Sequence, residues 1–405
     1  MRRRIRRASR RVGIGSAVRL AALTLGVSFG CAQHRGGLAP SGASTDASPS
    51  TDAGSSTDGG SSTDGGSSAT SIVVIFGGDV TLGYHYEEYF DDQLSKGRTH
   101  DEMLAYPFKE LNGRLRAVDL AVVNLECPFT ARGEKIPKNF NFRASPELVS
   151  ALLAGGVGAV SVANNHMMDY GPAGLFDTLE TLDLAKLPHF GAGRTLLEAR
   201  RPAIIERGGH KLALLGYFFL GTHNIEPAEV LATETTPGVA GHPADLKVMQ
   251  RMLREDVTAA RAQADLVIPF FHWGREGNHF PEAYQVELAH LAIDSGAAAV
   301  VGSHPHVLQG MELYRGAPIF YSLGNLVFGG NWDPKVKESA LVAVQFSSAG
   351  YLSTEIIPVQ IDRYPKLPIQ PFLLDEEHSR QVLQHLTEYS SKFEQMLPEL
   401  ARSKK

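Results

Sequence analysis

The feature that constrains this chain most is a series of short apolar runs, which alternate with helical patterns from residue 72 onward. Several runs are apolar at nearly every position, as in strands that are covered on both faces. They lie at 72–76, 120–123, 159–162, 212–217, 266–271, 297–301, 318–321, 341–346 and 356–361. The clearest helical patterns lie between them, at 145–154, 172–185, 243–264 and 281–295. This alternation predicts a layered α/β domain and excludes a wholly disordered or fibrous chain.

The end of the chain shows one further helical pattern. Apolar side chains at positions 382, 386, 389, 393 and 396 share one face of a helix that would run over Asp375–Leu397. We expect this helix to pack on the domain. The sequence therefore predicts a main folded domain at 71–365 and a helical tail at 366–405.

Charge is distributed unevenly along the chain. Residues 1–30 hold eight of the 39 lysines and arginines and no acidic residue. The rest of the chain carries 31 basic residues against 44 acidic ones, a net charge of −13. A body this acidic lacks the basic surface that phosphate neutralisation requires, so we expect no nucleic-acid partner. The two cysteines, Cys31 and Cys127, are too few for a disulfide framework.

The N-terminus has the layout of a bacterial secretion signal, which we place at 1–30. A basic cluster precedes a mostly small and apolar stretch that ends at Cys31. The last residues before Cys31 resemble a lipobox, in which the cysteine receives lipid, although Ser28 stands where leucine is usual. The same segment could instead be an uncleaved membrane anchor. Residues 31–70 are rich in Ser, Thr, Asp and Gly, which predicts a disordered tether. We therefore expect an exported, membrane-anchored protein of the cell envelope.

Five of the apolar runs lead into residues that can bind metal ions. In open α/β sheets the ligand crevice lies beyond the carboxyl ends of the strands, so these side chains should converge. A mixture of carboxylates, amides and imidazoles suits Mn, Fe or Zn, and this one is large enough for two ions. Taken singly, each residue could equally be an ordinary turn or loop residue. The residues supply two carboxylates, Asp79 and Glu126, one amide, Asn165, and four imidazoles, His166, His272, His304 and His306.

Six motifs in order resemble the CapA family, whose members are associated with poly-γ-glutamate capsule synthesis. The resemblance covers about 72–328. It implies a branch of the calcineurin-like metallophosphatases, with a four-layer α/β/β/α sandwich and a centre for two divalent metal ions. The motifs are Gly78-Asp79, Asn-Leu-Glu-Cys-Pro at 124–128, Ala-Asn-Asn-His-Met-Met-Asp-Tyr-Gly at 163–171, His-Trp-Gly at 272–274, Gly-Ser-His-Pro-His at 302–306 and Tyr-Ser-Leu-Gly-Asn at 321–325.

The resemblance also implies roles for single residues. The first metal ion would be held by Asp79 and His306, with Glu126 as a bridging ligand. Asn165, His272 and His304 would hold the second ion. The histidine that protonates the leaving oxygen would be His166, oriented by Asp169. Two asparagines, Asn124 and Asn325, could line the rim.

Two functions remain open at this stage. The first is a metal-dependent hydrolase that acts on a phosphoester or on the γ-linked glutamate polymer. The second is a non-catalytic accessory or scaffold protein for the polymer or its membrane-bound synthase. A proton donor at His166, paired with Asp169, favours the enzyme. Thr81 favours the accessory role, because the phosphatase pattern has histidine there. The threonine also predicts that the first ion binds more weakly than the second.

Overall fold

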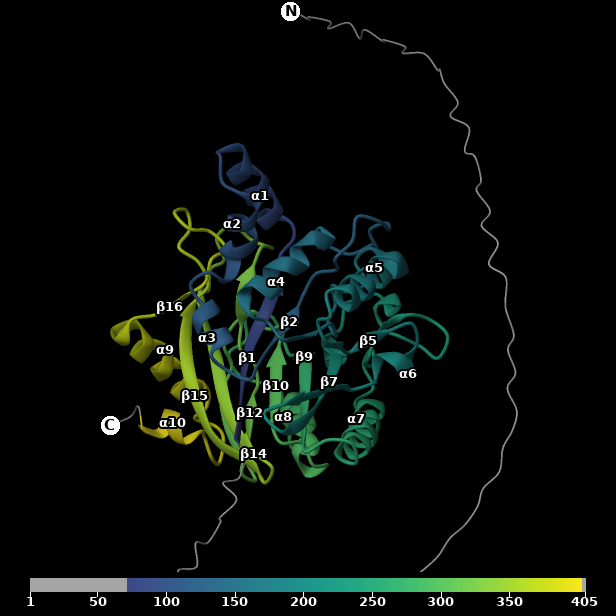
Figure 1. Cartoon of the computed structure of the whole chain (residues 1–405). Helices are drawn as coiled ribbons and strands as arrows, with labels where there is room; N and C mark the ends of the chain where they lie inside the picture. The colour runs from purple at the N-terminus through teal and green to yellow at the C-terminus, as the bar shows by residue number, and fades with distance from the viewer. Residues whose placement is uncertain (1–70, 403–405) are drawn as a thin grey trace, which may run out of the picture. The chain divides into compact units, whose positions relative to one another are not determined.

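The computed structural model describes residues 71–402 (Figure 1). The expected secretion signal, the lipidated Cys31 and the tether at 31–70 lie outside the described residues. Two β-sheets form the centre of the described part, and helices pack on their outer faces. Within residues 71–402, no helix has both the length and the apolar character needed to cross a bilayer.

The first sheet combines parallel and antiparallel strands. Its parallel part places β1, β2, β3 and β4 side by side, and β14 continues the sheet antiparallel to β1. A further strand, β13, pairs in parallel with the end of β1. The strands are β1 (Ser71–Thr81), β2 (Leu120–Leu125), β3 (Ala159–Ser161), β4 (His189–Phe190), β13 (Asn325–Phe328), β14 (Glu338–Ser347), β15 (Gly350–Gln360) and β16 (Phe372–Leu373).

The second sheet has the order β11-β12-β10-β9-β7-β6, and its central strands are parallel. A small ladder of β5 and β8 lies apart from both large sheets. The strands of the second sheet are β6 (Ala203–Arg207), β7 (His210–Phe219), β9 (Leu266–Trp273), β10 (Val300–Ser303), β11 (Met311–Tyr314) and β12 (Ala317–Phe320). The small ladder joins β5 (Ala192–Gly193) and β8 (Gly238–Val239).

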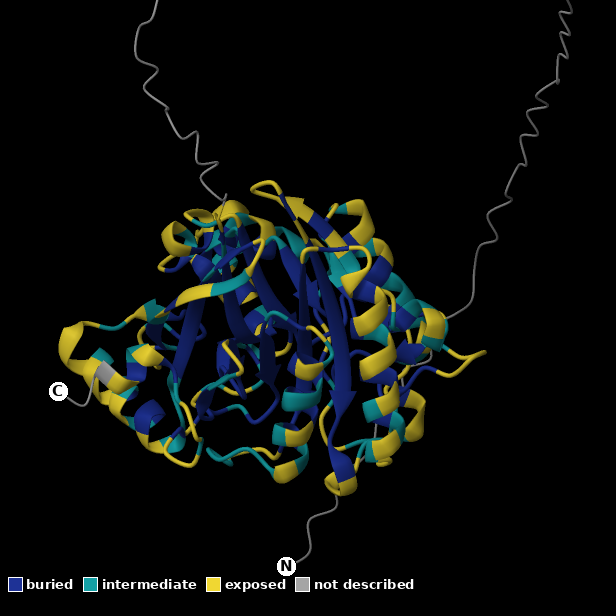
Figure 2. Ribbon diagram, turned by 90° about the horizontal axis from the view of Figure 1, so that it is seen from below, coloured by how far each residue is buried: buried dark blue, intermediate teal, exposed yellow. Residues whose placement is uncertain are grey.

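The alternation of side chains along the strands explains the layers. In β1, Ile72, Val74 and Phe76 belong to an apolar core that also contains Leu214 and Ile268 of the second sheet. Side chains on the opposite face of the first sheet pack against α1 to α5. The outer face of the second sheet packs against α7 and α8. Figure 2 shows these strands buried between more exposed helices. The predicted four-layer α/β/β/α sandwich is confirmed.

Before the tail, four of the described helices, α1, α2, α3 and α6, were not predicted by the sequence patterns. The α-helices before the tail are α1 (His85–Ser95), α2 (His100–Ala105), α3 (Asn112–Arg116), α4 (Val149–Gly155), α5 (Gly171–Leu184), α6 (Leu196–Ala199), α7 (Leu246–Arg261) and α8 (Ala283–Asp294). Short 3₁₀ turns lie at Tyr106–Phe108, Pro146–Leu148, Gly221–His223 and Ala228–Val230.

The C-terminal helix is shorter than the sequence predicted. Helix α9 covers Glu376–Tyr389 and packs on the core through Val382 and Leu386, but the chain leaves the helix before Leu397. The released residues cover the edge strand β11. Ser390 Oγ accepts a hydrogen bond from the Met311 amide at 2.8 Å, and the Gln395 carbonyl accepts one from the Leu313 amide at 2.9 Å. Pairing the exposed edge of a sheet thus outweighs continuation of the helix. The last helix is α10 (Pro398–Arg402).

Strand β1 changes its partner immediately before the first acidic site residue. Its pairing register shifts at Gly77 and Gly78, and its end then pairs with β13. The Asp79 amide donates to the Gly324 carbonyl at 3.0 Å. A Cβ on Gly78 would lie only 1.8 Å from that carbonyl oxygen, so only glycine fits. The close approach places Asp79 in register with Asn124 on one side and Asn325 on the other.

Candidate metal centre

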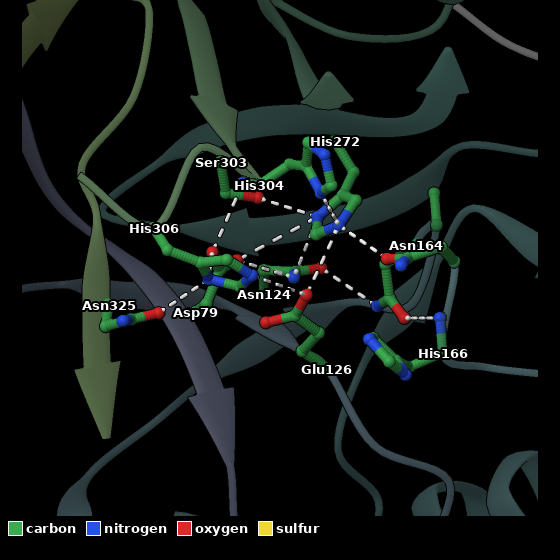
Figure 3. A network of polar contacts seen from close by, with 12 residues as sticks. Asp79, Asn124, Glu126, Asn164, His166, His272, Ser303, His304, His306 and Asn325 are labelled. Carbon is green, nitrogen blue, oxygen red and sulfur yellow. Dashed lines mark hydrogen bonds and ion pairs between the residues drawn. The ribbon is translucent and has the colours of Figure 1, made fainter. Parts of the chain in front are cut away.

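The predicted site residues converge where five strands end, three from the first sheet and two from the second (Figure 3). Strands β1, β2 and β3 lead into the carboxylates and asparagines. The imidazoles follow from β9 and β10. Each sheet therefore supplies a different kind of ligand, and the site forms only where the two sheets meet.

Asp79 is a fully buried carboxylate with several hydrogen-bond partners. Its Oδ1 accepts from Asn124 Nδ2 at 2.8 Å, and its Oδ2 accepts from the His304 amide at 3.2 Å. Burial raises the pKa of Asp79, and the nearby His306 and the Asn124 hydrogen bond oppose that rise. Asn124 is thus more than a rim residue, because its amide holds Asp79 in place.

Glu126 is the second buried carboxylate, and it differs from Asp79 in having no hydrogen-bond donor. Its side chain is inaccessible to solvent, and neither Oε1 nor Oε2 has a hydrogen-bond partner within the described residues. Burial and the charge of Asp79 raise the pKa of Glu126 well above its usual range. An unpaired buried carboxylate is costly, so its presence here needs a compensating cation or proton.

Three imidazoles surround Glu126. His272 Nε2 lies 3.3 Å from Glu126 Oε1 and 3.1 Å from His304 Nδ1. His306 Nε2 lies 3.9 Å from the same carboxylate oxygen. Burial lowers the pKa of His272 and of His304 well below the usual range. Neighbouring imidazoles add to this, namely His304 in the case of His272 and His306 in the case of His304. Neutral imidazoles offer the lone pairs that a metal ion requires.

The turn that carries two of these imidazoles is strained. His304 has φ +97° and His306 has φ +56°, a backbone region that residues other than glycine rarely adopt. The hydrogen bond from the His304 amide to Asp79 holds the turn on one side. On the other, His306 Nδ1 contacts Asn325 Oδ1 at 2.9 Å. In this conformation both imidazoles lie close to the carboxylate of Glu126.

The side chains fit a divalent metal centre, because their ligand atoms gather into two groups that share Glu126. Glu126 with His304 and His306 forms one group, and Glu126 with Asp79 and His272 forms the other; within each, the ligand atoms lie within 4.8 Å of one another. These groups contain five of the six residues predicted as ligands, and the sixth, Asn165, contacts His272 beside them. These groupings pair the imidazoles differently from the predicted division between two ions, and that division stays a prediction.

Asn165 faces the same cluster. Its Oδ1 lies 2.9 Å from His272 Nε2, and its Nδ2 donates to Glu226 Oε1 at 3.0 Å. The bond to Glu226 fixes the orientation of the amide, so the oxygen points towards the imidazoles. The preceding residue, Asn164, donates to the Leu125 carbonyl at 2.7 Å and to Asn124 Oδ1 at 3.1 Å. Asn164 therefore joins the end of β2 to the loop after β3.

His166 and Asp169 form a hydrogen-bonded pair beside the cluster. His166 Nδ1 lies 2.7 Å from Asp169 Oδ2, which also accepts a hydrogen bond from the Phe142 amide at 2.6 Å. The ring of Phe142 lies 4.3 Å from the imidazole, centre to centre. Burial lowers the pKa of His166, and Asp169 opposes that shift. Because Asp169 occupies Nδ1, Nε2 is the nitrogen left to exchange a proton.

Sequence reasoning missed two charged residues that support this pair. Lys138 is almost fully buried, and its ammonium contacts Asp169 Oδ1 at 3.0 Å and Glu226 Oε2 at 2.9 Å. It also donates to the Asn165 carbonyl at 2.9 Å. Neither Lys138 nor Glu226 follows a strand or belongs to a motif. Their only sequence signal is a position in irregular segments close to hydrophobic residues, which is too weak to single them out.

Two further residues, Thr81 and Cys127, limit the chemistry that the site can perform. Thr81 lies two residues after Asp79 on β1 and is fully buried, and its Oγ1 has no hydrogen-bond partner within residues 71–402. At this position the phosphatase pattern has a histidine, so Thr81 supplies no imidazole there.

Cys127 is a packed thiol. Burial raises the pKa of the Cys127 thiol to about 12, so this residue is a poor nucleophile at neutral pH.

Fold and site together define an α/β protein with a metallophosphatase-like fold and residue groups that could bind a metal ion. Residues 73–330 match the family described as bacterial capsule synthesis protein PGA_cap. The chain therefore belongs to this capsule synthesis family, the CapA family.

Three relatives illustrate the similarity. The PGA biosynthesis protein CapA of Bacillus subtilis is 31% identical over 78% of this chain and 78% of its own length. The capsule biosynthesis protein CapA of Bacillus anthracis is 30% identical over 78% of this chain and 72% of its own length. A probable polyglutamine synthesis accessory protein of Mycobacterium tuberculosis is 28% identical over 72% of this chain and 85% of its own length.

Proposed function

We propose that this protein acts in the synthesis or export of a capsule polymer of the poly-γ-glutamate type, and that it does so as a metal-dependent hydrolase of the cell envelope. The process is supported by the family and by the names of the two Bacillus relatives. The hydrolase activity rests on the site itself.

One observation carries the proposal for metal-dependent chemistry: the carboxylate of Glu126 is fully buried without a hydrogen-bond donor, and three imidazoles surround it. Divalent Mn, Fe or Zn suits this mixture of ligands. Asp79, Glu126, Asn165, His272, His304 and His306 would hold one or two such ions. When bound, the metal ions would polarise the scissile group and lower the pKa of an attacking water.

The protein's own residues would supply the proton transfer. Asp169 fixes the ring of His166 through Nδ1 and leaves Nε2 to protonate the departing oxygen. Phe142 covers the ring and limits the access of water to the pair. Asn124 keeps Asp79 oriented, and Asn325 does the same for His306. Their hydrogen bonds hold the ligands in place before substrate arrives.

A direct assay tests the enzymatic proposal. The full-length protein, purified in detergent, would be depleted of metal and then supplied with Mn²⁺ in the presence of a chromogenic phosphodiester or of poly-γ-glutamate. We expect hydrolysis of at least one substrate that depends on added Mn²⁺. Absence of turnover on both substrates, with metal bound, would contradict the enzymatic proposal.

A non-catalytic accessory role is the second candidate, and Thr81 favours it. Without an imidazole at this position, the centre has one ligand fewer than the phosphatase pattern provides. The name of the M. tuberculosis relative, an accessory protein, points the same way. A metal-loaded protein that binds poly-γ-glutamate or its synthase without hydrolysing either substrate would establish this alternative.

The location at the membrane is also a proposal, which rests on the N-terminal sequence. Lipidation of Cys31 would anchor the folded domain through the tether at 31–70. Substituting Cys31→Ser should release the protein from the membrane fraction. A Cys31→Ser protein that stays in that fraction would favour the uncleaved anchor instead.

A further inference from the structure

A cavity of about 420 Å³ opens beside the proton-donor side of the metal centre. Asn165 and His166 contribute to its lining, so it adjoins both a predicted metal ligand and the predicted proton donor. Two irregular segments, around residues 137–140 and 225–226, form much of its wall. A group that leaves after protonation by His166 would enter this space.

Two large apolar side chains line the cavity and remain exposed. Phe140 is 69% exposed and Ile225 is 84% exposed. They come from different segments of the chain, one between β2 and α4 and the other between β7 and α7. Single exposed apolar residues are ordinary, but two that line one cavity next to a reactive histidine offer a surface for an apolar ligand.

The charges around the cavity disfavour an anionic ligand. Among the described residues that line the cavity, the ammonium of Lys138 is the one cation, and the carboxylates of Asp169 and Glu226 already neutralise it. Glu276 also lines the cavity and is exposed, and within the described residues no ion pair is found for it. Its loop is held against the metal-binding turn, because the Gly277 amide donates to the Pro305 carbonyl at 2.9 Å. A carboxylate placed here would meet the carboxylate of Glu276.

We propose that this cavity, lined by Phe140, His166, Ile225 and Glu276, binds the leaving group of the substrate, and that this group is an apolar alcohol or phenol without negative charge. The inference rests on the proposed hydrolase function and narrows it. The expected substrates are phosphoesters of apolar alcohols or phenols. A carboxylate-bearing segment of the glutamate polymer should not bind in the cavity beside His166.

Binding of three phosphonates tests the proposal without requiring turnover, since the phosphonate group is not hydrolysed. The probes are methylphosphonate, phenylphosphonate and 4-carboxyphenylphosphonate, titrated by calorimetry into the full-length protein supplied with Mn²⁺. Burial of the ring should make phenylphosphonate bind about tenfold more tightly than methylphosphonate. The added carboxylate should abolish that gain.

Substitutions assign the effects to the cavity. The Phe140→Ser, Ile225→Ser double variant should lose the preference for phenylphosphonate, whereas Leu184→Ser, at an equally exposed apolar residue on α5, should keep it. Glu276→Gln should improve binding of the carboxylated probe about tenfold. Glu234→Gln, at another exposed glutamate, should have no effect.

The outcomes separate this inference from the function on which it rests. Equal binding of methylphosphonate and phenylphosphonate would overturn the inference and leave the metal centre standing. A carboxylated probe that binds as tightly as phenylphosphonate would also overturn it. If no phosphonate binds in the presence of Mn²⁺, the inference is overturned together with hydrolysis of phosphoesters, and the proposed hydrolase function is then tested by the assay with poly-γ-glutamate.

Discussion

The site has a metal half, formed by Glu126 and the imidazoles around it, and a proton-donor half, formed by His166 and Asp169. The two halves differ in how their buried carboxylates are paired. In the proton-donor half, Asp169 is paired with His166, with Lys138 and with the Phe142 amide. In the metal half, Glu126 is equally buried but has no hydrogen-bond donor, and its neighbours include His272 and His304, whose pKa values lie below the usual range. In the proton-donor half, residues of the chain itself pair the buried carboxylate. In the metal half, the buried carboxylate lacks a positive charge beside it.

This difference indicates that the metal half needs a compensating positive charge, for which we propose a divalent metal ion. Buried polar groups are normally paired, and those that are not mark a place where something else binds. The proton-donor half should therefore keep its geometry without metal. The metal half should depend on divalent ions for its stability and its chemistry.

Removing the charge of Glu126 should have the largest effect of the substitutions that distinguish the two halves, because it changes Mn²⁺ binding in the metal half. We expect Glu126→Gln to lower the affinity for Mn²⁺ at least a hundredfold, because the shared carboxylate belongs to both ligand groups. Without metal, the variant should be no less stable than the parent, because an unpaired buried carboxylate has been removed. Metal titration and urea unfolding would measure both, with Glu134→Gln as an exposed control. A large loss of stability in the metal-free variant would show that Glu126 is paired within the protein.

Removing the proton donor should affect the other half alone. We expect His166→Ala to keep its metal content and to lose turnover by about 10²–10⁴-fold, the usual contribution of a general acid. Elemental analysis and a phosphodiester assay would separate the two quantities. His223→Ala, at an exposed loop position, serves as the control. Loss of metal from the His166 variant would make this residue a ligand and would contradict the division of the site.

Lys138→Met tests whether the proton-donor half is held together by charge pairing. The substitution leaves two nearly buried carboxylates without their cation, which should lower the free energy of unfolding by about 3–5 kcal/mol. Urea denaturation would measure the change. Lys135→Met, at an exposed neighbouring residue, should change stability by less than about 0.5 kcal/mol. Equal stabilities of the two variants would show that the pairing contributes little.

The smallest expected effect concerns Thr81. An imidazole at this position should improve the binding of the more weakly held ion about tenfold, which corresponds to about 1.4 kcal/mol. Calorimetric titration of Thr81→His with Mn²⁺ would measure this gain. Thr81→Val is the matched control, because it keeps the shape and removes only the unpartnered hydroxyl. If Thr81→His binds no better than the parent, position 81 does not face the ions.

The sequence predicted most of the fold and the convergence of the candidate ligand residues, because both depend on short-range patterns. An apolar strand followed by a polar residue places that residue at the edge of a sheet, and five such strands converge. His166 and Asp169 lie three residues apart, so their contact is nearly local. The structure brings these residues together as the motifs indicated, whereas their roles in binding and catalysis stay predictions.

What could not be predicted depends on contacts between distant segments. Lys138 lies in a segment without periodicity, and it reaches Asp169 and Glu226 only because that segment wraps over the loop after β3. The early end of α9 has a similar cause, since Ser390 and Gln395 pair with β11, which is far away in the sequence. Local patterns carry no information about such pairings.

The most direct test of the metal centre is a titration of the metal-depleted full-length protein with Mn²⁺, in which bound metal is counted by elemental analysis at each step. We predict two ions per chain, of which the first binds tightly enough to be retained through purification when the protein is not depleted, and the second binds only when more metal is supplied. Two ions of equal affinity would contradict the weak site at Thr81. The absence of any bound ion with metal in excess would contradict the assignment of Glu126 and its imidazoles as a metal centre.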